Sequence, residues 1–141
     1  MTKARQGDYI SIQAYLGYDR DVHDELKRLQ GDLLTSTGLA TTLGYGPRFL
    51  HSTGQLHKGG PNTGLFMQIV DGAEGDVPVP GTEYSFGELT SAEALGDIIV
   101  LTDRGRRVLR VDLDGEGAEG VAKLRDLLNV IFQTRVVSVM A

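Results

Sequence analysis

Residues 39–70 read LATTLGYGPRFLHSTGQLHKGGPNTGLFMQIV and place a polar, glycine-rich connection between two apolar segments. The first segment, residues 39–43, is short, contains β-branched threonines and is closed by Gly44. The second, residues 65–70, is a continuous apolar run that ends at Asp71. Such runs are typical of buried strands, and an unbroken one favours a parallel strand covered on both faces. Residues 39–70 therefore predict two strands of an α/β sheet.

The preceding segment predicts a strand and then a helix. Residues 9–16 (YISIQAYL) place apolar side chains at every second position, which indicates a strand with one buried face. Asp19 and Asp21 stand where a helix would begin, because their carboxylates can accept hydrogen bonds from its free N–H groups. His23 lies on the charged face of this helix and is expected to face solvent. Four apolar residues form the buried stripe of the helix, which ends near Gly38: Val22, Leu26, Leu29 and Leu33.

A second long helix is predicted after the proline- and glycine-rich residues 72–81. Either Ser85 with Glu88 or Thr90 with Glu93 can form its capping box, and a glycine at position 105 can end it. The apolar residues that support this helix are Leu89, Leu95, Ile98, Ile99 and Leu101.

The last part of the chain completes the alternation. Residues 108–113 (VLRVDL) predict a fourth strand, and residues 136–140 fit either a short edge strand or a docked tail. Strands that alternate with helices at these lengths imply parallel crossovers. We therefore predict one domain over residues 1–141, an α/β three-layer sandwich with a mainly parallel, flavodoxin-like sheet. A final amphipathic helix is indicated by Val121, Leu124, Leu127, Leu128 and Ile131.

The composition narrows the class of protein. With 141 residues, 40% hydrophobic and 23% charged, the chain can bury an ordinary globular core. The net charge of -5 disfavours nucleic acid as a partner. Cysteine is absent, which excludes disulfides and thiolate metal sites. Residues 2–8 are polar, so neither a signal peptide nor a membrane anchor is expected and a cytoplasmic location is predicted. One local basic cluster is formed by Arg104, Arg106, Arg107 and Arg110.

The polar connection between these strands, residues 48–64, is the predicted functional site. It holds two of the three histidines, four glycines and three hydroxyl side chains, and it lies between strands, where α/β domains bind ligands. Ser52, Thr53 and the amides of the glycines could hold an anion such as a phosphate. Two plainer interpretations stay open. Ser52 and Thr53 could cap a helix beginning near Gln55, or the segment could be a surface loop.

No cofactor and no metal are expected from the sequence. It contains no phosphate-loop motif, and no GxGxxG follows a strand. His51 and His57 are six residues apart, which is not the spacing of a helical metal pair. A neutral imidazole can move the proton of a sugar hydroxyl, which makes His51 a candidate acid or base, although loop histidines are more often only hydrogen-bonded. Lys123 would by default be a solvated charge.

Two motifs carry a resemblance to a known family. LGYGPRFLHSTGQLHKGGPNTG at 43–64, followed by EYSFGEL at 83–89, resembles the glucose-6-phosphate isomerase family, most closely the isomerase part of fused transaldolase/glucose-6-phosphate isomerase proteins. The likeness runs over about residues 7–128. HSTGQ at 51–55 and EYSFGE at 83–88 are specific in combination and order.

The resemblance implies a sugar isomerase (SIS) domain of carbohydrate metabolism, acting in glycolysis without a metal or other cofactor. Enzymes of this family open a hexose ring and then move a proton between C2 and C1 through a cis-enediol. The family histidine that assists ring opening falls on His51, and the family lysine near the C-terminus falls on Lys123. The residues predicted to bind the substrate, a sugar phosphate, are Ser52, Thr53, Gln55, His57 and Lys58.

The chain departs from the family pattern in two places. DGEGAEG at 114–120 stands before Lys123 where the family has FDQxGVE. The family glutamate that acts as the base would fall near the end of the first helix, where this chain has Thr35, Ser36 and Thr37. A hydroxyl cannot replace that carboxylate, because its pKa is far too high to hold a proton transiently at neutral pH.

Three interpretations of the function follow. The chain corresponds to the second of the family's two isomerase domains, so as an enzyme it would need a homodimer or a partner chain supplying the missing first isomerase domain or a transaldolase-like domain. Alternatively, it is a non-catalytic sugar-phosphate-binding or assembly subunit that docks on a transaldolase-like partner. A third possibility is that the sequence is a piece of a longer enzyme.

Overall fold

The computed structural model describes residues 4–72 and 76–139. Within these ranges the helices and strands alternate along the chain. In order they are β1 (Tyr9–Tyr15), α1 (Arg20–Thr37), β2 (Ala40–Tyr45), the short 3₁₀ turn η1 (Arg48–Leu50), α2 (Ser52–Gly59), β3 (Gly64–Val70), α3 (Phe86–Asp103), β4 (Arg107–Asp112) and α4 (Gly117–Val139).

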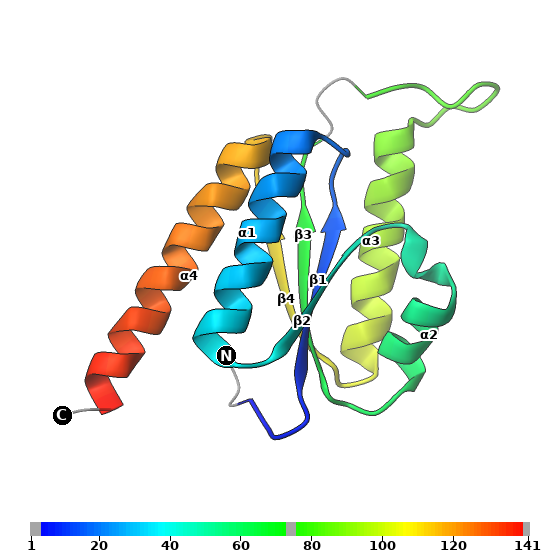
Figure 1. Cartoon of the computed structure of the whole chain (residues 1–141). Coiled ribbons are helices and arrows are strands. Elements are labelled where there is room, and N and C mark those ends of the chain that lie inside the picture. Colours follow the sequence, from blue (N-terminus) through cyan, green and yellow to red (C-terminus); the bar gives the residue numbers. More distant parts are fainter. Residues whose placement is uncertain (1–3, 73–75, 140–141) are drawn as a thin grey trace.

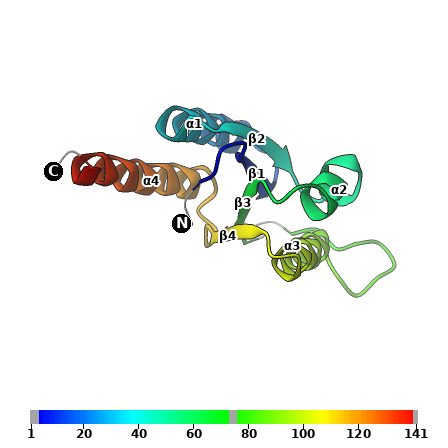
Figure 2. The ribbon, with the colours of Figure 1, turned by 90° about the horizontal axis from the view of Figure 1, so that it is seen from below.

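The four strands form one parallel sheet in the order β2-β1-β3-β4. Helices α1 and α4 cover one face of the sheet, and α2 and α3 cover the other (Figures 1 and 2). The predicted α/β three-layer sandwich with a flavodoxin-like parallel sheet is confirmed. No helix in the described part of the chain combines the length and the apolar character that crossing a membrane requires.

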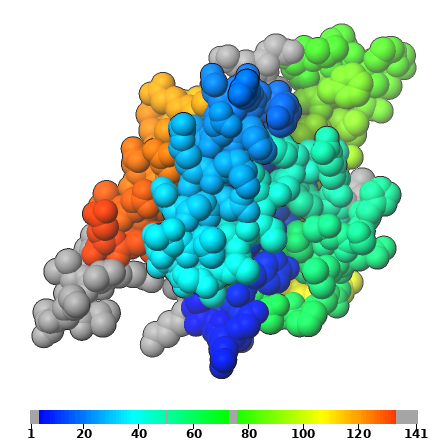
Figure 3. All heavy atoms as spheres, viewed as in Figure 1, coloured from blue at the N-terminus to red at the C-terminus, as the bar shows by residue number. Residues whose placement is uncertain are grey.

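The two faces of the sheet differ in chemistry. Towards α1 and α4, the alternate residues of β1 and β3 join a wholly apolar core. In the space-filling view α1 and α4 lie side by side (Figure 3). Towards α2 and α3, Gln13, Tyr15 and Gln68 are buried and hydrogen-bonded to those helices. The candidate site therefore lies on the polar face. The strand residues of the apolar face are Ile10, Ile12, Ala14, Met67 and Ile69.

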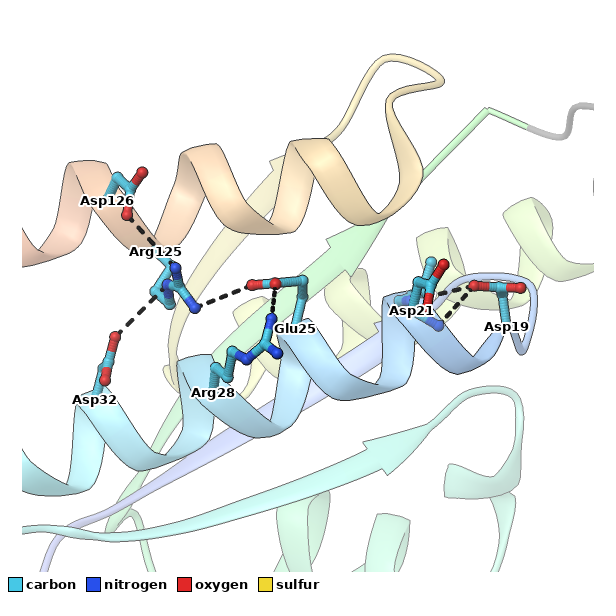
Figure 4. Close-up of polar contacts among 8 residues, drawn as sticks. Asp19, Asp21, Glu25, Arg28, Asp32, Arg125 and Asp126 are labelled. Carbon is cyan, nitrogen blue, oxygen red and sulfur yellow. Dashed lines mark hydrogen bonds and ion pairs between the residues drawn. The ribbon is translucent and has the colours of Figure 1, made fainter.

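Helices α1 and α4 are joined by polar contacts above the apolar core (Figure 4). Arg125 of α4 reaches Glu25 of α1, with Nη1 to Oε2 at 3.0 Å, and its Nε lies 3.7 Å from Asp32 Oδ2. Asp19 caps α1 by accepting a hydrogen bond from the Asp21 N–H at 2.8 Å. Gly38 ends α1 with φ 67°. This angle lies in the left-handed region, which glycine adopts more readily than other residues.

Three local expectations are settled or corrected. Of the two possible capping boxes, Ser85 with Glu88 is the one that forms. Residues 136–139 continue α4, so the edge strand is wrong for them, and Met140 lies outside the described residues. His23 is half-buried instead of facing solvent, because its Nδ1 lies 3.1 Å from the Tyr45 hydroxyl.

Asp8 ties the start of β1 to the start of β4. Its carboxylate accepts two hydrogen bonds of 2.7 Å from the Arg107 guanidinium and one of 2.6 Å from the Arg5 N–H. These bonds, led by those from Arg107, lower the pKa of Asp8 from 3.8 to about 2. The carboxylate therefore binds a proton less readily in the folded chain than in the unfolded one.

A pH dependence of stability follows from this lowered pKa. The contribution of Asp8 should be complete above the unfolded pKa near 4 and should be lost as the pH falls towards the folded pKa of about 2. We expect the difference in urea midpoint between the wild type and Asp8→Asn to shrink over that window. Asp24→Asn, an exposed carboxylate of α1, is the control and should show no such trend. A difference that stays constant with pH would contradict the assignment.

Candidate functional site

The predicted site segment forms a turn and a short helix. After β2 the chain makes η1 and enters α2 at Ser52, three residues before the predicted start at Gln55. Gly54 explains how α2 fits there, because a Cβ at this position would lie 1.4 Å from the carbonyl oxygen of Phe49. Only glycine allows the helix to pack directly on η1. This close contact fixes the position of His51, which lies between the two elements.

The N-terminus of α2 is open. His51 occupies the N-cap position but gives no side-chain cap, whereas Asp19 caps α1 and Ser85 caps α3. The plainer interpretation, in which Ser52 and Thr53 cap the helix, is therefore wrong. The exposed first turn can offer N–H groups and hydroxyls to an anion, which the helix dipole also favours. Four predicted site residues are exposed together here: His51, Ser52, Thr53 and Gln55.

His57, a predicted substrate residue, is buried instead. The residue is 4% exposed, its Nδ1 lies 3.1 Å from Gln13 Nε2, and its ring packs against Phe49 and Phe66 with centroids 5.8 and 4.9 Å away. Burial lowers the pKa of His57, opposed by the nearby Asp97 charge. A neutral imidazole with Nδ1 accepting from the Gln13 amide fits these contacts. His57 therefore fastens α2 to β1.

Lys58 is fastened in a similar way. Its Nζ pairs with Oδ1 of Asp97 on α3, and Asp97 Oδ2 accepts a hydrogen bond from the Tyr15 hydroxyl of β1. Asp97 is 6% exposed, so the pair lies largely out of water. Burial, followed by the bond to Asp97, raises the pKa of Tyr15, which keeps the phenol protonated. The predicted site segment thus contains anchors as well as exposed groups.

Lys123 is placed apart from the α2 segment. It lies on α4, on the opposite face of the sheet from α2 (Figures 1 and 2). Its Nζ pairs with Glu116 at 2.7 Å and with Glu119 at 3.1 Å, and these bonds raise the pKa of the lysine. The end of α1, where the family glutamate would fall, carries hydroxyls that bond back to the helix, as Thr37 does to Leu33 O at 2.6 Å. Within one chain, the structure does not bring His51 and Lys123 together.

A separate crevice of about 810 Å³ opens at the carboxyl ends of the strands. Ligands of open α/β sheets bind at this edge. None of the seven predicted site residues lines it. The signal that could have located it is the pair of aspartates that follow or end the strands, Asp71 after β3 and Asp112 at the end of β4. Its charged lining residues are Asp19, Asp71, Asp76, Asp112, Asp114 and Arg110.

The crevice and the start of α2 differ in charge. Five carboxylates face one guanidinium there, which disfavours an anionic ligand. Part of that acidic lining is structural, because Asp71 accepts hydrogen bonds from the N–H groups of Gly115 at 2.6 Å and Gly117 at 3.0 Å. Residues 48–60 contain no carboxylate and include Arg48, while the charge of Lys58 is paired with Asp97. An anion is therefore better placed at α2. In the described ranges no group of three or more acidic or histidine side chains could hold a metal ion.

Comparisons with known proteins bear on the fold. No model of a protein family and no curated protein matches the chain. Among solved structures, the chain is similar to a hypothetical protein from Thermus thermophilus, with a TM-score of 0.70 and 21% sequence identity over 83% of this chain. The match covers 32% of that protein, so the chain spans about a third of its length. At this identity the likeness shows the shared α/β fold alone.

Proposed function

We propose that this chain is the C-terminal sugar isomerase domain of a glucose-6-phosphate isomerase-like enzyme, which acts on an aldose or ketose phosphate together with a second chain. The observation that best supports the proposal is the uncapped N-terminus of α2, where His51, Ser52 and Thr53 are exposed together. These three residues begin the motif that resembles the family's. No carboxylate in residues 48–60 opposes an anionic substrate there.

His51 is the group that would perform proton transfer in ring opening. An imidazole can act as a general acid or base, so it can take the proton of a sugar hydroxyl and give one to the ring oxygen. The hydroxyls of Ser52 and Thr53 and the free N–H groups of the first turn would hold the sugar phosphate beside it. In this arrangement His57 and Lys58 support the helix and do not touch the substrate.

The need for a second chain follows from what one chain lacks. His51 precedes α2 and Lys123 lies on α4, and these two helices cover opposite faces of the sheet, so one chain does not place both residues at one substrate molecule. The proton transfer between C2 and C1 needs a base, and Thr35, Ser36 and Thr37 cannot serve as one. A second chain, either another copy or a different isomerase domain, would have to supply the carboxylate.

The missing carboxylate also favours one alternative function. A domain with an anion-binding helix terminus and no base suits a non-catalytic sugar-phosphate-binding or assembly subunit that docks on a transaldolase-like partner. Glucose 6-phosphate and fructose 6-phosphate interconversion distinguishes the two. Turnover that requires a co-purifying second chain favours the isomerase. Binding of the sugar phosphate without turnover, with that chain present, favours the subunit.

Substitution of His51 tests the site itself. We expect glucose 6-phosphate to shift the amide resonances of residues 51–55, and His51→Ala to weaken its binding at least about tenfold, because a hydrogen bond to a charged or polar ligand group is lost. His51 is exposed, so the unfolding midpoint should stay unchanged. Lys27→Ala, an exposed cation of α1, is the control and should bind as the wild type does.

Two other ligands distinguish the contributions of the sugar and of the phosphate to binding. Glucose without phosphate should bind far more weakly than glucose 6-phosphate. Inorganic phosphate should shift the amide resonances of residues 51–55 equally in the wild type and in His51→Ala. Shifts confined to the crevice residues, or equal binding by His51→Ala and the wild type, would contradict the proposed site.

A further inference from the structure

Helix α3 is apolar on the side that faces solvent. Its other side meets the sheet through Ala94, Asp97 and Leu101, which are buried. On the outer side Leu89, Leu95, Ile99 and Val100 are 40%, 52%, 49% and 37% exposed. The outer side of α1, in contrast, is mostly polar and charged. Large apolar side chains gathered on the solvent side of a helix are typical of a surface that another element covers.

The spacing of the outer side fits another helix. Leu89, Ala92, Gly96 and Ile99 follow one another at intervals of three, four and three residues, which is the spacing of a helix-packing seam. The two middle residues are small, and a Cβ at Gly96 would meet nothing within 4 Å. The backbone of a second helix can therefore approach closely at Ala92 and Gly96.

We propose that this outer side of α3 is the contact surface between two copies of the chain, with the α3 helices packed antiparallel about a twofold axis midway between Ala92 and Gly96. Such an axis sets Ala92 of one copy opposite Gly96 of the other, and Leu89 opposite Ile99. Small residues then meet at the crossing and large ones pack beside it. A twofold contact is also the commonest way for a protein to pair with itself.

The charges at the two ends of α3 are complementary in this arrangement. Glu83 and Glu88 lie at the N-terminal end, and Arg104 lies at the C-terminal end beside the exposed Asp103. Glu83 and Arg104 make no ion pair within the part of the chain that the structure describes. Antiparallel pairing brings Arg104 of each copy beside residues 83–88 of the other. A pair between Arg104 and Glu83 of the other copy at each end would favour the antiparallel direction.

The surface also extends beyond the seam. Tyr84 and Phe86, at the start of α3, are 47% and 51% exposed and continue its apolar character. Helix α2 lies beside α3 on the same face of the sheet (Figures 1 and 2). Pairing through α3 would therefore set the second copy next to the helix that carries His51. The inference stands on the α3 surface and does not depend on the proposed sugar chemistry.

The oligomeric state in solution tests the inference. Light scattering on the wild type from about 1 to about 100 µM should give a mass of twice the 15.2 kDa of one chain at the upper end. Leu95→Glu should raise the dimer dissociation constant at least about 100-fold, because it places a charge inside the contact of both copies. Leu34→Glu is the matched control, since Leu34 is 50% exposed on α1. It should leave the dimer intact.

Gly96→Leu separates the contact from folding. The position is helical with open space above it, so the monomer should remain as stable as the wild type or become more so, while the bulky side chain keeps the second helix away. A folded, monomeric Gly96→Leu variant supports the inference. A wild type that is monomeric over the whole concentration range would overturn it. A dimer that survives Leu95→Glu, or dissociates with Leu34→Glu, would do so as well.

Discussion

Gly54→Ala is expected to lower the free energy of unfolding by about 3 kcal/mol, the upper end of the range for overpacking a fitted contact. The added methyl would lie 1.4 Å from the Phe49 carbonyl oxygen, and the obstacle is backbone, which cannot turn aside as a side chain can. Helix α2 must then move away from η1, and His51 moves with it. Urea denaturation measures the loss, and amide exchange should locate the loosening in residues 49–60.

Gly59→Ala is the matched control in the same helix. A Cβ at Gly59 would meet nothing within 4 Å, so the substitution adds helix propensity without a clash and should raise stability by up to about 1 kcal/mol. Equal stability of Gly54→Ala and Gly59→Ala would show that α2 does not rest on the Phe49 carbonyl. The glycine of the HSTGQ motif would then need another explanation.

The fold could be predicted because its signals are local. The period-two pattern of β1 separates the apolar face from the polar one, and Ser85 with Glu88 marks the start of α3 three residues apart in sequence. Helix α3 shows where such signals stop. Leu89, Leu95 and Ile99 predict a helix correctly, yet they lie on its exposed side. Apolar periodicity identifies a helix but does not say which of its sides meets the sheet when both are apolar.

Which residues of the predicted site segment are exposed and which are buried could be predicted only in part, for a related reason. His51, Ser52 and Thr53 lie next to one another in sequence, and the helix that begins there keeps them together. The partner of Lys58 is Asp97, 39 residues away on α3, and the partner of His57 is Gln13, 44 residues away on β1. Those pairings depend on how three elements pack, and no spacing in the sequence encodes them. The sequence therefore did not show that Lys58 pairs with Asp97 of α3.

Lys58→Met should distinguish an anchor from a substrate ligand. If Lys58 anchors α2, its removal leaves the Asp97 carboxylate buried with the Tyr15 hydroxyl as its remaining partner. Breaking one side of a buried pair in this way typically costs about 3 kcal/mol or more. Lys123→Met is the control, because that lysine is 56% exposed and its pairs with Glu116 and Glu119 lie at the surface. The free energy of unfolding of Lys123→Met should hardly differ from that of the wild type.

A double variant makes the test specific to the pair of Lys58 and Asp97. In Lys58→Met/Asp97→Asn the buried charge is gone and the Tyr15 hydroxyl keeps a partner, so the double variant should be more stable than Lys58→Met alone. Such a positive coupling cannot arise if Lys58 serves only a ligand, since the unliganded protein would then tolerate its loss. A ligand role predicts the reverse result, with unchanged urea midpoints and weaker binding of glucose 6-phosphate. The pattern of stability across these variants therefore decides whether the lysine holds the helix or the sugar phosphate.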